Sequence, residues 1–252
     1  MDWVVDAGNT HLRWAGVRAG RVCWQAALRE VTMEGLTGAW GGAAPPDRLL
    51  VASVATPEKR AELAGIASRL WGLEPEFLRS PAMGWGVRNA YRAPAQLGID
   101  RFAALVAANQ RHPDGALVVD IGTAVTADLL VAGEHRGGYI LPGPGLMARA
   151  LANGTAGVPA ADPDPATAPG VDTPSGAGRG IIHAVVGAIA EVRTHLAAQG
   201  LSGVPCLLTG GGAALVASRI APPRIQLPGL VLEGLARMAA EPMDRDACGS
   251  SF

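Results

Sequence analysis

The chain has 252 residues, of which 49% are hydrophobic and 17% are charged, so it can bury the core of one large domain or of two smaller ones. Its formal net charge of −1 argues against a nucleic-acid-binding surface and against electrostatic attraction to a membrane. Lys59 is the single lysine, and no glycine-rich loop precedes it. A Walker-type phosphate loop is therefore excluded.

Cysteine and histidine spacing excludes further classes of site. The three cysteines, Cys23, Cys206 and Cys248, form no CxxC pair, so we expect neither a disulfide framework nor a thiolate zinc site. The five histidines share no metal-ligand spacing, and no serine stands in a G-x-S-x-G motif.

The first residues lack the pattern of a signal peptide, and the apolar stretches are too interrupted to span a bilayer. We expect a cytoplasmic protein.

Hydrophobic periodicity predicts strands and helices in alternation through the first part of the chain. Strands are expected at 2–6, 10–17, 21–27, 48–54 and 74–80, with the first two forming a hairpin. A helix is expected at 56–72, where Pro57 marks its start and Gly72 its end. Residues 83–98 read as irregular, and a helix at 100–112 follows with Asp100 as its N-cap.

The opening pattern restarts near residue 116. A strand is expected from near residue 116 up to the turn at 120–123, and a second strand at 124–132, followed by a turn at 133–136 and the segment "GGYILPG" at 137–143. Later helices are expected at 146–154, 179–200, 213–220 and 227–240, with a buried strand ending at Thr209 and a mobile surface loop at 152–178. The order predicts an α/β protein with domains at 1–115 and 116–252.

Three strands run into glycine turns, at Asp6–Thr10, Asp120–Thr123 and Thr209–Gly212. Glycines expose backbone N–H groups that suit phosphate oxygens, and Thr10 and Thr123 add hydroxyl donors. The aspartates can hold a cation beside the phosphates. One such turn alone is more often a tight hairpin, but a near-duplicate pair favours a nucleotide site.

A competing motif is "GPGLMA" at 143–148, which fits the dinucleotide fingerprint of an oxidoreductase. Pro144 removes a backbone donor from that turn, and no strand is evident to carry Asp162 or Asp164 as the ribose-binding acid. This alternative is the weaker one.

Five segments together resemble the type III pantothenate kinases, a family that includes the Bvg accessory factors. They are "DAGNT" (6–10), "YRAPAQLGIDR" (91–101), "DIGTAVT" (120–126), "GGYILPG" (137–143) and "TGGG" (209–212). The resemblance implies two actin-like (ribonuclease H-like) domains, with mixed sheets flanked by helices, that close around ATP. It also implies a homodimer, and transfer of the γ-phosphoryl group to the 4′-hydroxyl of pantothenate, the first step of coenzyme A biosynthesis. The implied cofactors are Mg²⁺ with ATP and a monovalent cation, K⁺ or NH₄⁺.

The resemblance also implies roles for individual residues. The implied ATP-binding residues are Asp6, Ala7, Gly8, Asn9, Thr10, His11, Leu12, Arg13 and Thr123. The implied pantothenate-binding residues are Tyr91, Gly98, Ile99, Asp100, Arg101 and Thr173, with Asp100 as proton acceptor. Asp120 is the implied ligand of the monovalent cation.

This sequence departs from the family pattern in a few places. Arg13 stands where many members have lysine, Pro144 is added after the "GGYILPG" segment, and the loop before Thr173 is unusually rich in alanine and proline.

The residues alone leave other functions open. Asp100 suits a helix cap as well as a general base, and Arg101 could bind a substrate carboxylate or be solvated. A small-molecule kinase with another acceptor is one alternative, and a non-catalytic nucleotide-binding regulator is a second. The intact aspartates Asp6, Asp100 and Asp120 argue against a regulator that has lost its chemistry.

Overall fold

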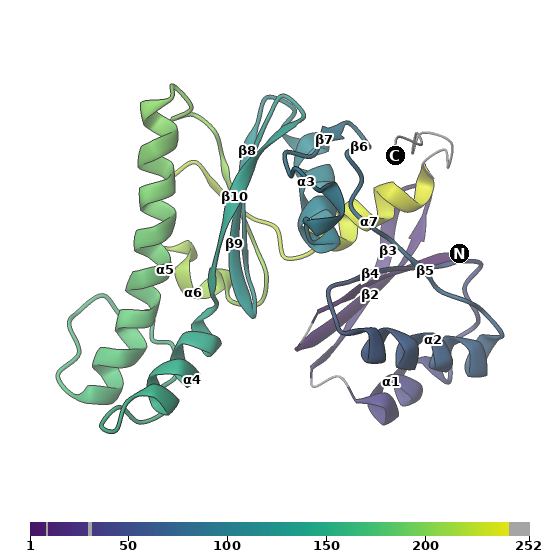
Figure 1. Ribbon diagram of the computed structural model, residues 1–252, viewed down its shortest axis with the longest axis horizontal. Coiled ribbons are helices and arrows are strands. Elements are labelled where there is room, and N and C mark those ends of the chain that lie inside the picture. Colours follow the sequence, from purple (N-terminus) through teal and green to yellow (C-terminus); the bar gives the residue numbers. More distant parts are fainter. Residues whose placement is uncertain (9, 30–31, 242–252) are drawn as a thin grey trace. The chain divides into compact units, whose positions relative to one another are not determined.

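The computed structural model describes residues 1–8, 10–29 and 32–241 of the chain. The chain forms two compact units, one of Met1–Arg111 together with the residues from Leu230 onward, and one of His112–Gly229 (Figure 1). The first boundary is near the restart expected from the sequence. The last helix, expected in the second domain, belongs instead to the first unit.

The first unit is built on a mixed sheet with the strand order β3-β2-β1-β4-β5. Its strands are β1 (Asp2–Ala7), β2 (His11–Arg18), β3 (Arg21–Arg29), β4 (Leu49–Ser53) and β5 (Glu76–Phe77). β1, β2 and β3 form an antiparallel meander, and β4 and β5 continue the sheet in parallel with β1. A short hairpin of β6 (Met83–Gly84) and β7 (Val87–Arg88) lies within the segment expected to be irregular.

Helices α1 (Met33–Trp40) and α2 (Pro57–Trp71) pack against one face of this sheet, with Trp3, Trp14 and Trp40 in the shared core. α2 begins at Pro57 and ends at Gly72, whose φ of 65° is left-handed, as its sequence predicts. The sequence does not predict α1, since its short "MEGLTGAW" segment contains two glycines.

Helix α3 (Ile99–Arg111) follows a single 3-10 turn, η1 (Pro94–Gln96), and packs against α7 (Leu230–Ala240). A side chain at Gly234 would bring its Cβ within 1.8 Å of the carbonyl oxygen of Ala103, so the two helices meet backbone to backbone. The buried residues of α7 complete the core of the first unit, which explains why the chain returns to it after the second unit.

The second unit repeats the topology of the first, with its strands in the order β12-β11-β8-β9-β10. They are β8 (Ala116–Ile121), β9 (Ala124–Val131), β10 (Glu134–Pro142), β11 (Cys206–Thr209) and β12 (Arg224–Gln226). Again a meander, β8-β9-β10, precedes two parallel strands. The turn expected at 133–136 is instead at Ala132 and Gly133, both with positive φ, and β10 begins at Glu134.

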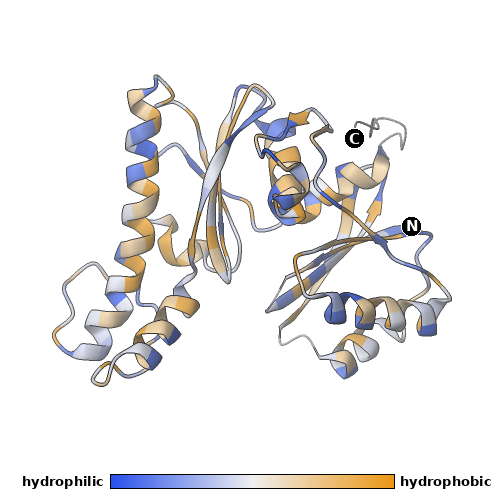
Figure 2. Ribbon diagram, in the orientation of Figure 1, coloured by the Kyte–Doolittle hydropathy of each residue, from blue (hydrophilic) through white to orange (hydrophobic). Residues whose placement is uncertain are grey.

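Three helices complete the second unit: α4 (Pro144–Gly154), α5 (Thr173–Ala198) and α6 (Ala213–Ala217). Side chains of α5 and α6 form a core with β8 and β9 that includes Leu117, Val119, Ile182 and Val216. α5 is long and apolar enough to cross a membrane by length and composition. Polar and apolar residues alternate along it in Figure 2, and its buried residues identify it as a core helix of this unit.

Candidate active site

The ends of β1 and β2 bring Asp6 and Arg13 together in the first unit. The two residues face each other in the antiparallel register, and Arg13 Nη2 donates a hydrogen bond of 2.8 Å to Asp6 Oδ2. Asp6 is 7% exposed. Asp6, Arg13, Tyr91, Asp100 and Arg101 are called the Asp6 cluster below.

Burial is the largest influence on the Asp6 carboxyl and raises its pKa to about 6. The positive charge of Arg13 lowers this pKa, and the negative charge of Asp100 raises it. Asp6 is buried and Asp100 partly buried, and two carboxylates that repel each other gain from a cation placed beside them. The Asp6 cluster therefore suits a divalent cation that arrives with phosphate groups.

Asp100 is the second residue of α3, so its predicted place as the N-cap residue is wrong. The carbonyl of Gly98 accepts the first helical bond, from Phe102 N at 3.0 Å. The Asp100 Oδ1 atom accepts a hydrogen bond of 2.8 Å from the backbone N–H of Arg101. A Cβ at Gly98 would lie 2.4 Å from that same oxygen, which explains a glycine at this position.

Arg101 is buried, and its Nη1 donates a hydrogen bond of 2.9 Å to the hydroxyl of Tyr91. The guanidinium carbon also lies 5.6 Å from the centre of the Tyr91 ring. The structure thus brings these two predicted substrate-binding residues into direct contact. A buried guanidinium beside a phenol can recognise a carboxylate on a small substrate.

Asn89, which sequence reasoning missed, organises the loop that carries Tyr91. Its Nδ2 donates to the carbonyls of Pro81 and Pro94, both at 3.1 Å, and its Oδ1 accepts from Tyr91 N at 3.0 Å. Its backbone N–H donates to Ala82 O at 2.9 Å. The one signal in the sequence is an amide residue in a segment without periodicity.

In the second unit, Thr209 ends β11 and lies opposite Asp120, the second-last residue of the neighbouring parallel strand β8. Gly212 N donates to Ile121 O at 2.8 Å, and a Cβ at Gly210 would lie 2.3 Å from Asp120 Oδ1. The turns at 120–123 and 209–212 therefore pack closely, because the glycines of the second turn have no side chains to hold the two backbones apart.

Gly143 joins the same turns. Its N–H donates to Thr123 O at 2.9 Å, and a Cβ there would lie 2.1 Å from Gly122 O. The segments 120–123, 209–212 and Gly143 are called the glycine-turn cluster below. Glycine turns of this kind, with an aspartate where one begins and threonines beside the glycines, suit phosphate oxygens and a hard cation.

The other predicted nucleotide residues differ in what they can offer. Ala7 and Leu12 are buried, so only their backbone can reach a ligand, whereas the side chains of Thr10, His11 and Thr123 are exposed. Gly8 N donates to His11 O at 3.0 Å and so shapes the turn. Asn9 lies outside the described residues. Among the predicted pantothenate-binding residues, Ile99 is buried, as Arg101 is.

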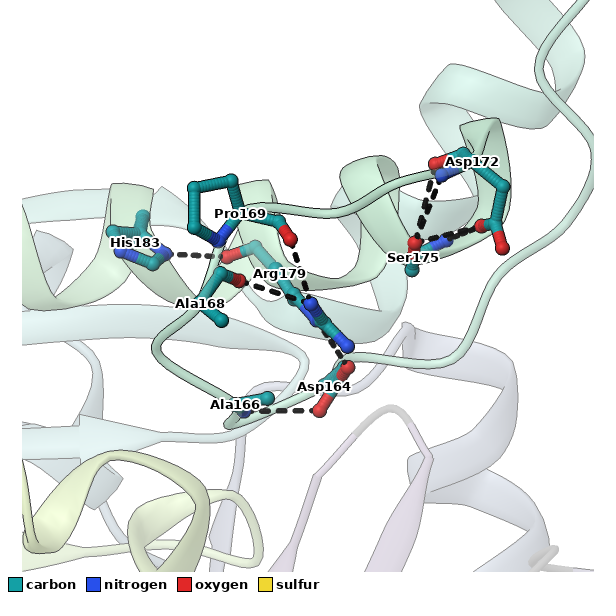
Figure 3. A network of polar contacts seen from close by, with 8 residues as sticks. All are labelled: Asp164, Ala166, Ala168, Pro169, Asp172, Ser175, Arg179 and His183. Atoms are coloured by element: carbon teal, nitrogen blue, oxygen red, sulfur yellow. Dashed lines mark hydrogen bonds and ion pairs between the residues drawn. The ribbon is translucent and has the colours of Figure 1, made fainter.

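Thr173 is the first residue of α5 and not part of the preceding loop, as Figure 3 shows for its neighbours Asp172 and Ser175. Asp172 and Ser175 form a capping box. The hydrogen bonds of Ser175 hold the pKa of the Asp172 carboxyl below its usual value.

Arg179 fastens the loop before α5 to that helix (Figure 3). Its Nε donates to Asp164 Oδ2 at 2.8 Å, and its Nη1 donates to the carbonyls of Ala168 and Pro169 at 3.0 and 2.9 Å. The loop expected to be mobile is therefore anchored within its own chain.

The dinucleotide alternative is wrong. A dinucleotide fold needs a parallel strand–helix–strand unit, but β10 runs antiparallel to β9, and α4 leads into the anchored loop and α5. Pro144 begins α4, and Asp164 is engaged by Arg179.

No group of three or more histidine, cysteine, aspartate or glutamate side chains within the described parts of the chain is arranged to hold a metal ion. A cation at Asp6 or Asp120 would therefore take further oxygens from backbone, water or a phosphate ligand.

The comparisons with known proteins agree with this chemistry. A family model described as type III pantothenate kinase matches residues 3–195. A type III pantothenate kinase of Halorhodospira halophila is 37% identical over 244 residues, covering 93% of this chain and 96% of the relative.

Two solved structures share the fold at low identity. A Baf family transcriptional activator from Campylobacter jejuni has a TM-score of 0.61 at 17% identity, covering 94% of this chain and 96% of its own. MreB5 of Spiroplasma citri, bound to ADP, has a TM-score of 0.51 at 12% identity, with coverage of 94% and 95%. These two likenesses establish an actin-like fold.

Proposed function

Because the chain belongs to the type III pantothenate kinases and transfers a phosphoryl group from ATP to pantothenate, we propose that Asp100 is the general base of this reaction. The observation that carries the proposal is the position of its carboxylate. It is oriented by the N–H of Arg101 in the first turn of α3, and it lies close enough to Asp6 for the two charges to interact. A carboxylate so placed can accept the proton of an attacking hydroxyl.

Arg101 and Tyr91 bind the acceptor in this proposal. The guanidinium pairs with the pantothenate carboxylate, and the Tyr91 hydroxyl orients the guanidinium through their 2.9 Å hydrogen bond. Gly98 and Ile99 contribute the backbone that leads into α3. A guanidinium matches the two oxygens of a carboxylate, so this arrangement favours an acceptor that carries a carboxylate, such as pantothenate, over alcohols that carry none.

The two glycine-containing turns act on the nucleotide. Phosphoryl transfer depends mainly on positioning and on neutralising charge, and backbone N–H groups with Arg13, Thr10 and Thr123 supply both. Asp6 is the residue that would meet Mg²⁺ carried by ATP. Asp120 would bind K⁺ or NH₄⁺, since a carboxylate oxygen suits a hard cation.

We further propose a cytoplasmic homodimer in which Thr173 of one subunit contacts pantothenate bound by the other. The support is the family resemblance, together with the exposed position of Thr173 at the start of α5.

Asp100→Asn tests the assignment of the base. We expect the variant to bind ATP normally and to lose roughly 10²-fold or more in turnover. Asp114→Asn, at an exposed turn aspartate, is the matched control and should keep its activity. Production of phosphopantothenate is measured with labelled ATP, Mg²⁺ and K⁺. Full turnover in Asp100→Asn, with or without a loss of thermal stability, would reduce Asp100 to a helix-stabilising role.

A further inference from the structure

The second unit contains a cavity of about 400 Å³, and none of the residues proposed for the kinase reaction lines it. The second half of α5, the segment around Leu201 and Val204, and the residues after α6 surround it. Its walls are mostly apolar, with Val186, Ile189 and Leu196 on one side and Leu117, Leu201 and Ile220 on the others. A cavity of this size is in the range that holds small organic ligands.

The cavity lies at the other end of the sheet from the glycine-turn cluster. Leu117 lines it, and the same strand reaches Asp120 only three residues later. At roughly 3.3 Å per residue these positions are about 10 Å apart along the strand. A ligand in the cavity would therefore not occupy the phosphate site.

Two arginines give the cavity a positive charge. Arg219 Nη1 is buried and has no hydrogen-bond partner. Arg193 donates to the carbonyl of Pro222 at 2.9 Å and to that of Ala221. Among the described residues that line the cavity, none is acidic. The two carbonyls accept hydrogen bonds from Arg193, but they are neutral, so they leave its positive charge without a compensating negative charge.

Arg193 and Arg219 both line the cavity, and a carboxylate is the acceptor that best matches a guanidinium. The apolar walls would pair with a hydrocarbon chain rather than with a second polar group. We propose that this cavity binds a small monocarboxylate with a hydrocarbon tail, its head at Arg219 and Arg193 and its tail along α5. The hydroxyls of Thr194 and Ser202, which also line the cavity, can donate further bonds to the head.

Octanoate is a direct probe, and its binding is measured by titration calorimetry on the full chain. We expect octanoate to bind at least tenfold more tightly than octanol, because octanol lacks the charged head. Shortening the chain to hexanoate should weaken binding by up to about fourfold for each methylene removed. Saturation with a non-hydrolysable ATP analogue should leave the octanoate affinity unchanged.

Two variants locate the site. Arg219→Gln should weaken octanoate binding at least tenfold, whereas Arg224→Gln, which removes the same charge from an arginine outside the cavity lining, should not. Ala190→Phe, which places a ring in the cavity, should abolish binding while thermal unfolding shows an intact fold.

The proposal is overturned if octanoate and octanol bind alike, if Arg219→Gln binds as the parent does, or if no heat of binding appears at millimolar octanoate. Equal weakening in Arg219→Gln and Arg224→Gln would also overturn it, since only the overall charge would then matter.

Discussion

Asp6 carries its proton at a higher pH than an exposed aspartate does, because burial and the nearby Asp100 outweigh the favourable charge of Arg13. Its pKa rises from 3.8 to about 6 on folding. Between these values the folded protein binds more protons than the unfolded chain, so the free energy of unfolding falls as the pH rises.

We expect this one group to lower the stability of the nucleotide-free protein by about 3 kcal/mol in total as the pH rises from about 3 to about 7, with about 2 kcal/mol of that loss between pH 4 and pH 6. Urea denaturation of the parent and of Asp6→Asn at a series of pH values isolates the contribution. The asparagine variant should lack this part of the slope. Parallel pH profiles in the two proteins would show that Asp6 titrates normally.

Asp120 supports a second prediction at the same scale. If Asp120 holds the monovalent cation as proposed, Asp120→Ala should weaken or abolish activation by K⁺ and raise the ATP concentration needed for half-maximal rate, because a hard oxygen ligand is lost. Rates are compared in KCl and in choline chloride at equal ionic strength. If the variant has the same ratio of the two rates as the unmutated protein, Asp120 is not the cation ligand.

At the scale of elements, the glycine-turn cluster depends on close backbone contact. Gly143 has an ordinary φ of −71°, so its glycine is required by space and not by backbone conformation. A methyl group there would meet the carbonyls of Gly122 and Thr123 at 2.1 and 2.5 Å. Backbone atoms cannot swing aside as a flexible side chain can.

Gly143→Ala should therefore destabilise the protein by about 1–3 kcal/mol, as other overpacked sites do, and should weaken ATP binding by displacing the turn at Thr123. Gly145→Ala is the matched control two residues later, where the nearest atom is the end of the Arg149 side chain at 3.6 Å. Unfolding midpoints and ATP titrations measure both effects. Equal behaviour of the two variants would contradict the close contact.

Elements with local signals could be predicted from the sequence. The hairpin β1-β2 and the ends of α2 follow from alternation, Pro57 and Gly72. α1 and β12 could not be predicted, because one is short and contains two glycines and the other is three exposed residues beside β11. Their stability comes from neighbours that are distant in sequence.

The site is predictable where its chemistry is concentrated in motifs. The order of aspartate, glycine and threonine predicts turns at Asp6 and Asp120, and each of them joins two antiparallel strands; phosphate binding at these turns stays a prediction. The role of Asn89 is not predictable, because its partners Pro81, Tyr91 and Pro94 lie in a loop without periodicity. The predicted beginning of α5 is six residues late, since Asp172 and Ser175 resemble loop residues unless their capping box is recognised.

At the scale of the whole molecule, the two units share one topology, which explains why a similar turn opens each of them. The turn joining β1 to β2 and the turn joining β8 to β9 hold the same place in their sheets. The differences between the units lie in their insertions: the Asn89 loop in the first and the loop fastened by Arg179 in the second.

The proposed dimer leads to a complementation test. If each site uses Asp100 of one chain and Thr173 of the other, Asp100→Asn and Thr173→Ala homodimers should both be impaired. Co-expression of the two variants should restore activity, because one site of each mixed dimer has both intact residues. With random pairing, roughly a quarter of all sites would be whole.

Mixed samples no more active than the average of the Asp100→Asn and Thr173→Ala homodimers would reject the shared site. The comparison needs the dimeric state of each sample, measured by sedimentation. A monomeric parent with full activity would reject the dimer as well.

The return of α7 to the first unit affects how the protein is made. Leu230, Leu235 and Met238 belong to the core that α3 helps to build, yet they follow the whole of the second unit in the sequence. On the ribosome, the first unit therefore cannot be completed until α7 has been translated, after the whole of the second unit. The second unit is continuous in sequence from His112 to Gly229, so we expect it to complete its fold before the first unit, whose synthesis began earlier.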